Sequence, residues 1–278
     1  MPGLTSPATV TTTLTYFTPP TDGERAYQKI LGPVDGERSL VKNWDSEERH
    51  NITIENVRGR EDTVSLDKTG FQYFQHTSKH KSFTSDEEIK AEYYPESIEL
   101  IKKLTGASRV VLFDHTIRRH RPGTKSLNQP VSQVHVDQTN KAAINQVHRN
   151  LPAEEVPELL KKRFQIINLW RPIGTPALDW PLTMCDYRSV APGDAVPVAL
   201  IYPEREGETF MVKYNENHKW KYLRGMTPDE VALIKCFDSL QDGSVAVFTP
   251  HTGFKDPSTP EGTPPRESIE LRSIVFYD

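Results

Sequence analysis

The segment QVHVDQT (residues 133–139) places a histidine and an aspartate two positions apart. In a β-strand, side chains at positions i and i+2 project from the same face, so His135 and Asp137 can reach the same point. Imidazole and carboxylate are both metal ligands, and two histidines with one carboxylate leave adjacent positions open on Fe(II), as oxygen activation requires. The pair therefore predicts two of three metal ligands. The alternative is that two polar residues only share one side of a strand.

A third ligand has to come from another histidine, and His251 is the strongest candidate. Residues 244–251 alternate as in a strand, which puts His251 on the same face as Val247 and Thr249, where the strand would meet a pocket. The alternative is a histidine at a strand end in a loop. His50 precedes an expected strand and is no better placed than the rest. Six others have polar neighbours and are expected to be exposed: His76, His80, His115, His120, His148 and His218.

Two arginines and a serine follow His251 along the chain, beyond a loop with four prolines. Arg266, Ser268 and Arg272 have the same parity, so they point the same way in an unbulged strand. A guanidinium presents a planar fork that suits a carboxylate, and a nearby hydroxyl adds one more donor. This pattern predicts a site for a carboxylate ligand. The alternative is salt bridging with Glu267 or Glu270.

Composition limits the class of protein that can carry these residues. The 278 residues are 36% hydrophobic, which is enough for one substantial core, so we expect one domain with peripheral elaborations. A net charge of −4 leaves no large basic surface, which makes nucleic acid an unexpected partner. We expect neither a signal peptide nor a membrane span. Cys185 and Cys236 are far apart, as in a cytoplasmic protein with reduced, buried thiols.

The first part of the chain is expected to be irregular and mixed. Residues 1–15, rich in Ser, Thr and Pro, read as a flexible leader, and residues 16 to about 107 as a helical and mixed elaboration. Within it, Ser85 and Glu88 form a capping box that predicts a helix, interrupted near Pro95 and ending at Gly106.

The region from about residue 108 to 278 is expected to be the β-rich core, with a helical insert at residues 142–163. A second capping box, at Thr227 and Glu230, predicts a helix through residue 240. Many short strands with helices beside them favour a sandwich or barrel, so the predicted class is mainly β with flanking α-helices. The expected strands cover residues 108–117, 164–173, 183–190, 196–202, 208–214, 218–224, 244–251 and 268–278.

The order His-x-Asp, distant His, then Arg-x-Ser resembles the Fe(II)- and 2-oxoglutarate-dependent oxygenases, including plant-type members and isopenicillin N synthase. Longer strings resemble the fungal hydroxylase/desaturase family often labelled AsaB-like or gibberellin-desaturase-like. This resemblance runs from about residue 50 to the end. The strings are TGASRVVLFDHTIRR, HVDQT, INLWRP, CDYRSV, PHTGFKDP and PPRESIELR.

The resemblance implies a single oxygenase domain over residues 1–278 with a double-stranded β-helix core, the cupin-like jelly-roll. It implies Fe(II) held by His135, Asp137 and His251, with 2-oxoglutarate and O2 as cosubstrates. Arg266, with Ser268, would bind the distal carboxylate of 2-oxoglutarate. Because the proline loop lengthens the gap after His251, Arg272 remains the competing anchor.

The activity implied is oxidation of an aliphatic C–H bond in a small molecule of fungal secondary metabolism, by hydroxylation, desaturation or oxidative cyclisation. Asn168 and Trp170 share a face of the strand expected at residues 164–173. Trp170 could wall a pocket and Asn168 could orient the substrate or the keto acid; the alternative is a core tryptophan and a satisfied buried amide. Other functions left open are an iron oxidase that does not use 2-oxoglutarate, a cupin-like metal-dependent isomerase or hydrolase, and a non-catalytic β-sandwich binding module.

Overall fold

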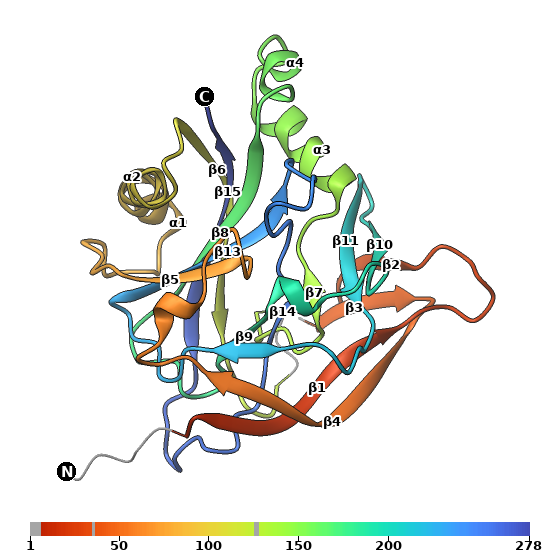
Figure 1. Ribbon diagram of the computed structural model, residues 1–278, viewed down its shortest axis with the longest axis vertical. Helices are drawn as coiled ribbons and strands as arrows, with labels where there is room; N and C mark the ends of the chain where they lie inside the picture. The colour runs from red at the N-terminus through yellow and green to blue at the C-terminus, as the bar shows by residue number, and fades with distance from the viewer. Residues whose placement is uncertain (1–6, 35–36, 125–127) are drawn as a thin grey trace.

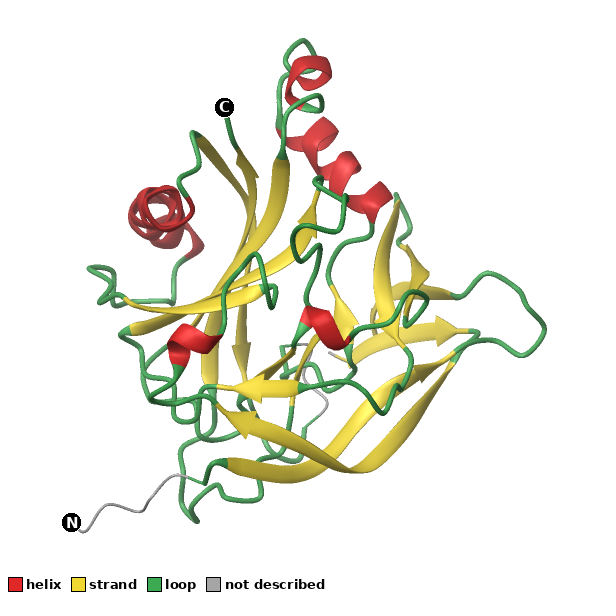
Figure 2. Cartoon of the chain, in the orientation of Figure 1, coloured by secondary structure: helices red, strands yellow, loops and turns green. Residues whose placement is uncertain are grey.

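Two β-sheets carry most of the chain in the computed structural model, which describes residues 7–34, 37–124 and 128–278 (Figures 1 and 2). The helices are α1 (Asp86–Glu88), α2 (Tyr94–Thr105), α3 (Asn140–Asn150) and α4 (Val156–Leu159). The strands are β1 (Thr9–Thr18), β2 (Tyr27–Val34), β3 (Glu37–Lys42), β4 (Asp45–Asn56), β5 (Phe71–Gln75), β6 (Arg109–Arg119), β7 (His135–Val136), β8 (Phe164–Pro172), β9 (Leu182–Cys185), β10 (Ala195–Ile201), β11 (Glu206–Val212), β12 (Trp220–Tyr222), β13 (Glu230–Asp238), β14 (His251–Gly253) and β15 (Glu267–Phe276).

The larger sheet has the strand order β1-β4-β12-β9-β14-β7-β11-β10-β2-β3, and the smaller has the order β5-β13-β8-β15-β6. The sheets curl toward each other, and side chains that follow β7 in one sheet meet side chains of β8 and β15 in the other. The predicted class, mainly β with flanking helices around a jelly-roll core, is confirmed. None of the described helices has the length and apolar character needed to cross a membrane.

The smaller sheet is held by strands that are buried on both faces. Every residue of β8 and of β13 is buried. One face packs Ile166, Trp170 and Ile234 toward the larger sheet, and the other packs residues such as Leu169 and Leu233 with the buried side of α2. Full burial of a side chain of this size stabilises the fold by about 1.5–3 kcal/mol. These central strands therefore give the site between the sheets a rigid wall.

The predicted helix after Ser85 is confirmed, with a local change of geometry. The Ser85 side chain accepts a hydrogen bond from the Glu88 backbone N–H at 3.3 Å, which caps α1. A π-helical turn over Ile89–Tyr93 leads into α2, in whose first turn Pro95 needs no N–H donor. Gly106 ends the helix with φ of 73°, a left-handed conformation that glycine adopts without steric cost.

The helix predicted after Thr227 is wrong, because β13 occupies that segment. Glu230 does accept the Thr227 backbone N–H at 2.7 Å, as in a capping box. The chain then stays extended because β13 lies between β5 and β8, where apolar side chains are needed on both faces. A continuous apolar run does not distinguish a buried strand from a buried helix.

Three further expectations need correction. Residues 9–15 are not a flexible leader: β1 begins at Thr9, and Val10 and Leu14 are buried; residues 1–6 lie outside the described part of the chain. Strands β1 to β4 belong to the larger sheet, so the boundary near residue 107 does not separate an elaboration from the core. The strand expected at residues 244–251 is reduced to β14, because residues 244–250 run as a loop. Both cysteines are free and buried, as expected.

A buried ion cluster ties β13 to its surroundings. The fully buried Lys235 donates to Asp238 at 2.8 Å and to Asp67 at 3.0 Å, and Arg163 donates to Asp238 at 2.7 Å. Burial raises the pKa of Asp238, but the hydrogen bond from Arg163 and the charge of Lys235 outweigh it, so the pKa lies below its usual value. The carboxylate is therefore charged in the folded protein at neutral pH.

We expect Asp238→Asn to lower the free energy of unfolding by about 3 kcal/mol at neutral pH, because Lys235 loses its nearest buried counter-charge. Since the folded-state pKa is depressed, this contribution is present above the unfolded-state pKa of about 3.9 and is lost as the pH falls through the folded-state value. Urea unfolding of both proteins across acidic pH measures it. An equal difference at every pH would contradict the assignment.

Candidate metal centre

His135, Asp137 and His251 come together between the two sheets. His135 lies in β7 and pairs directly with His251 of β14, so their rings project from the same face with centroids 4.5 Å apart. The Oδ1 atom of Asp137 lies 3.4 Å from His135 Nε2 and 4.0 Å from His251 Nε2. One ligand atom from each residue falls within a span of 4.8 Å, which is the arrangement of a three-residue metal site.

Backbone contacts orient both imidazole rings. The Nδ1 atom of His135 lies 2.8 Å from the Gln133 carbonyl oxygen, and Nδ1 of His251 lies 2.9 Å from the Thr249 carbonyl oxygen. A carbonyl only accepts, so each Nδ1 donates and each Nε2 keeps its lone pair. Burial lowers the pKa of His251, which favours the neutral ring. Both rings therefore direct a nitrogen with a free lone pair toward Asp137.

One oxygen of the Asp137 carboxylate faces the two imidazoles, and the other accepts hydrogen bonds from the opposite sheet. Asn168 Nδ2 donates to Oδ2 at 2.8 Å, and Arg272 Nε donates to the same oxygen at 3.0 Å. Burial raises the pKa of Asp137, but the charge of Arg272 outweighs it and holds the pKa well below its usual value. The group is therefore an ionised carboxylate whose Oδ1 faces the two imidazoles.

Gly70 supports the loop that carries His251, and sequence reasoning did not find it. Its φ is 91°, and its carbonyl oxygen accepts the Thr249 hydroxyl at 2.6 Å. A Cβ atom at Gly70 would lie 2.3 Å from Thr249 Oγ1 and 3.0 Å from the Phe248 carbonyl oxygen. Only glycine allows this close approach, and the carbonyl of the same Thr249 orients His251.

We expect Gly70→Ala to weaken metal binding as well as stability, because the added methyl group displaces Thr249 and with it the acceptor for His251. Gly59→Ala is the matched control: Gly59 also has a positive φ, 81°, but a Cβ atom added there would meet nothing within 4 Å. The control should lose only about 1 kcal/mol of stability, from backbone strain. Co(II) titration and thermal unfolding measure both effects, and equal Co(II) affinity in the two variants would refute the coupling.

Arg266 is a buried cation with few hydrogen bonds and no carboxylate partner among the described residues. Its guanidinium donates to the Trp180 carbonyl oxygen, and its Nε has no hydrogen-bond partner. Among the described residues, no carboxylate lies within ion-pair distance of it. Burial, together with the charge of Arg118, lowers the pKa of Arg266 to about 9. A buried cation without a counter-ion is costly, so this geometry suits an incoming anion.

The surroundings of Arg266 connect it with the metal centre. Its guanidinium carbon lies 5.6 Å from the centroid of the Trp170 ring. A Cβ atom at Gly253, two residues after His251, would lie 3.6 Å from Arg266 Nη1. Ser268 is buried on β15. The guanidinium therefore lies near Trp170 of the smaller sheet and near Gly253 of the larger sheet, on the same strand as His251.

Arg272 differs from Arg266 because its guanidinium N–H groups already donate to carboxylates. Besides Asp137, it donates to Glu270 at 2.6 Å and to Asp114 at 3.1 Å. The salt bridge to Glu270 considered for this region is therefore formed by Arg272. Strand register explains the grouping: Glu270 pairs with Trp170 and Arg272 with Asn168, and paired residues share a face.

Of the six histidines that were expected to be exposed, only His148 is exposed. His76, His115 and His120 are half-buried, and His80 and His218 are buried, so the expectation is wrong for these five. His80 pairs with Glu92 at 2.9 Å and His218 with Asp194 at 3.1 Å. Neither joins the metal centre. Tertiary burial of a polar residue has no local signature when its partner lies elsewhere in the chain.

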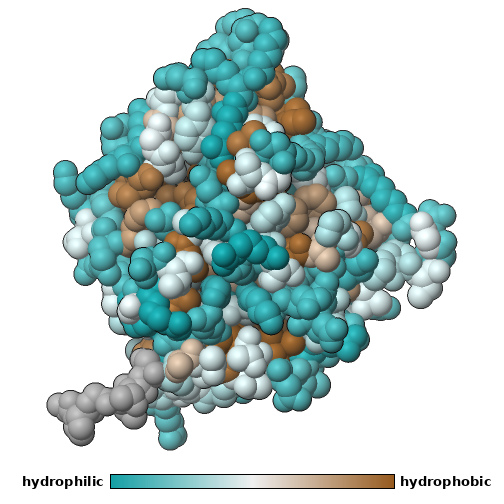
Figure 3. Space-filling view, viewed as in Figure 1, coloured by the Kyte–Doolittle hydropathy of each residue, from teal (hydrophilic) through white to brown (hydrophobic). Residues whose placement is uncertain are grey.

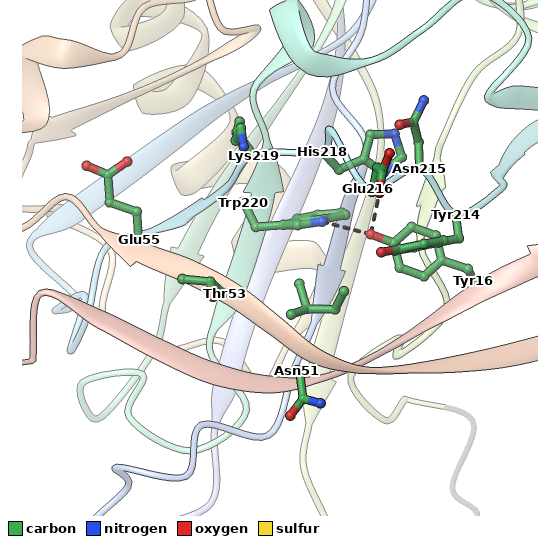
Figure 4. Close-up of a pocket in the computed structure, with 11 residues that line it drawn as sticks. Tyr16, Asn51, Thr53, Glu55, Tyr214, Asn215, Glu216, His218, Lys219 and Trp220 are labelled. Carbon is green, nitrogen blue, oxygen red and sulfur yellow. Dashed lines mark hydrogen bonds between the residues drawn. The ribbon is translucent and has the colours of Figure 1, made fainter.

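A separate pocket of about 340 Å³ opens beside β4 and β12, and no residue of the triad lines it (Figure 4). Figure 4 shows Trp220 and His218 directed at the Tyr16 hydroxyl, which accepts the Trp220 indole N–H at 2.8 Å. The face of the molecule in Figure 3 is mainly hydrophilic, and its hydrophobic residues form small separate patches.

Comparison with known proteins shows similarity over almost the whole chain. The family model described as Oxidoreductase/YMDC permease-like domain matches residues 14–276. The Fe(II)/2-oxoglutarate-dependent dioxygenase nvfI of Aspergillus novofumigatus is 33% identical over 260 residues, covering 91% of each chain. The hydroxylase/desaturase efuI of Hormonema carpetanum is 35% identical over 297 residues, covering 97% of this chain and 96% of the relative. The solved structure of the iron and alpha-ketoglutarate-dependent endoperoxidase NvfI matches with a TM-score of 0.81 and 31% identity, over 98% of this chain and 99% of that one.

Proposed function

Because this chain belongs to the hydroxylase/desaturase family of Fe(II)/2-oxoglutarate-dependent dioxygenases, we propose that His135, Asp137 and His251 hold its Fe(II). The observation that carries the proposal is the convergence of two imidazole nitrogens and one carboxylate oxygen, each oriented by a hydrogen bond at its other atom. Two neutral imidazoles and one carboxylate form the donor set of non-haem Fe(II) oxygenases, so the residues present fit the metal.

Arg266, with Ser268, is the proposed anchor for the distal carboxylate of 2-oxoglutarate. The Arg266 guanidinium is buried, lacks a carboxylate partner among the described residues and keeps a free Nε donor. Arg272 fits this role less well, because Asp137, Glu270 and Asp114 already engage its donors. Trp170 lies against the Arg266 guanidinium, so its proposed role is to wall the cosubstrate site and exclude water.

When bound, Fe(II) with 2-oxoglutarate and O2 supplies oxidative decarboxylation to succinate and CO2, coupled to oxidation of an aliphatic C–H bond. The chain positions the ligands and keeps water from them. His251 is almost fully buried, and donors from the opposite sheet hold Asp137 in place. The proposed substrate is a small molecule of fungal secondary metabolism, modified by hydroxylation, desaturation or oxidative cyclisation. The relatives' names, hydroxylase/desaturase and endoperoxidase, support this range. A cytoplasmic location is proposed from the two free, buried cysteines.

Succinate formation tests the proposed function. The protein is incubated in air with Fe(II), ascorbate and 2-oxoglutarate, and both acids are followed by NMR with and without a chelator. We expect equal amounts of 2-oxoglutarate consumed and succinate formed, and neither after chelation. Metal-dependent O2 uptake above the protein-free rate, followed in parallel with an oxygen electrode, without succinate would favour an iron oxidase that does not use 2-oxoglutarate.

A further inference from the structure

We infer that Asn168 is a positioning residue that fixes the orientation of the Asp137 carboxylate; this inference rests on the proposed role of Asp137 as a metal ligand. Asn168 Nδ2 lies 2.8 Å from Asp137 Oδ2, the oxygen that faces away from the two imidazoles. The sequence pattern suggested instead a contact with substrate or keto acid, or a satisfied buried amide.

The hydrogen bonding of Asn168 shows that its amide serves Asp137 specifically. The residue is completely buried, and among the described residues its side chain makes one hydrogen bond, the one to Asp137. Its Oδ1 atom is buried and has no partner. A buried amide that only filled the core would normally have both atoms satisfied, because an unpaired polar atom costs about 1–3 kcal/mol. The position of the amide therefore satisfies its Nδ2 donor, which bonds to Asp137, and leaves its Oδ1 acceptor without a partner.

Asp137 itself lies outside the strand ladder of the larger sheet. Strand β7 consists of His135 and Val136 alone, and Asp137 follows its end. Asn168, in contrast, lies in the centre of β8, where it pairs with Arg272 of β15 on one side and Ile234 of β13 on the other. A donor in the centre of β8 therefore holds a carboxylate that follows the end of a two-residue strand in the other sheet.

Asn168 and Arg272 act on the same oxygen but differ in charge. With both donors on Oδ2, only Oδ1 is left to face His135 and His251. Removal of Arg272 would also change the charge beside a dication, which confuses the interpretation of any change in affinity. Asn168 is neutral, so its replacement leaves the formal charge beside the metal unchanged. Outer hydrogen bonds of this kind typically change metal affinity by about 10- to 100-fold.

Asn168→Leu and Asn168→Ala test the inference, with Co(II) as a redox-stable probe. Leucine keeps the volume and removes the donor. We expect Co(II) to bind about 10- to 100-fold more weakly in both variants, with a changed visible d–d spectrum in the bound state. The matched control is Gln165→Leu, since Gln165 is also a buried amide of β8 and donates to Asp238 at 2.6 Å, remote from the triad. It should lose stability but keep the Co(II) affinity and spectrum of the wild-type protein.

The outcomes separate this inference from the proposed function. If either Asn168 variant folds and binds Co(II) with wild-type affinity and spectrum, the positioning role is wrong, while the metal site stands. If Asn168→Ala does not fold, Asn168→Leu decides in the same way. If the wild-type protein does not bind Co(II), or His251→Ala binds it equally well, the proposed metal site itself fails.

Discussion

The His251→Ala variant is expected to bind Co(II) or Fe(II) more than about 100-fold more weakly than the wild-type protein, and to form no 2-oxoglutarate complex. His251 is one of the three proposed ligands of the metal. Loss of a residue that hydrogen-bonds to a ligand weakens metal binding by about 10- to 100-fold, and loss of a ligand itself should weaken it more. Its Nε2 faces Asp137 Oδ1 at 4.0 Å, and its Nδ1 is already used by the Thr249 carbonyl. No other described histidine stands near enough to replace it.

His218→Ala is the control for this substitution. His218 is buried and faces a carboxylate, Asp194, at 3.1 Å, so its loss should cost stability in a similar way. Because it lies outside the triad, metal affinity should not change. Isothermal titration with Co(II) compares the three proteins. Equal loss of affinity in both variants would mean that the effect arises from general destabilisation and not from a lost ligand.

The second large effect is expected from Arg266→Ala, which should weaken 2-oxoglutarate binding to the metal-loaded protein by about 30-fold or more. A charge-assisted hydrogen bond to a buried carboxylate contributes about 2 kcal/mol, which corresponds to this factor. Metal affinity should change little, because Arg266 contacts none of the three ligands. The variant thus separates the cosubstrate anchor from the metal site.

Arg272→Ala provides the comparison with the competing anchor. Arg272 contacts Asp137, so its loss should act first on metal binding and only then on the cosubstrate. Titration of 2-oxoglutarate at saturating Co(II) distinguishes the two arginines. If Arg272→Ala loses as much cosubstrate affinity as Arg266→Ala under these conditions, the anchor is Arg272.

The sequence predicted those parts of the site that depend on local periodicity. The i, i+2 spacing of His135 and Asp137 was sufficient to place both on one face. The shared parity of Arg266, Ser268 and Arg272 predicted one strand face; Ser268 and Arg272 lie on β15, and Arg266 directly precedes it. The alternation of residues 244–251 made His251 a candidate, although residues 244–250 form a loop and not a strand. The pairing of His135 with His251 joins distant segments, and only the resemblance to known oxygenases brought the two together.

The contacts that sequence reasoning missed all depend on tertiary structure. Gly70 is needed because Thr249 approaches it closely, and Asn168 donates to a carboxylate from the opposite sheet. The helix predicted after Thr227 was wrong for the same reason, since burial of β13 on both faces follows from its two neighbouring strands. A local sequence pattern does not indicate which distant segments will pack against it.

Anaerobic addition of Fe(II) and then 2-oxoglutarate to the wild-type protein tests the central claim most directly. Chelation of the metal by the keto acid gives a weak visible charge-transfer band. We predict that this band appears with Fe(II) and 2-oxoglutarate together, with neither alone, and not in His251→Ala. Absence of the band in folded wild-type protein, or its persistence in His251→Ala, would contradict a site in which His135, Asp137 and His251 hold the iron.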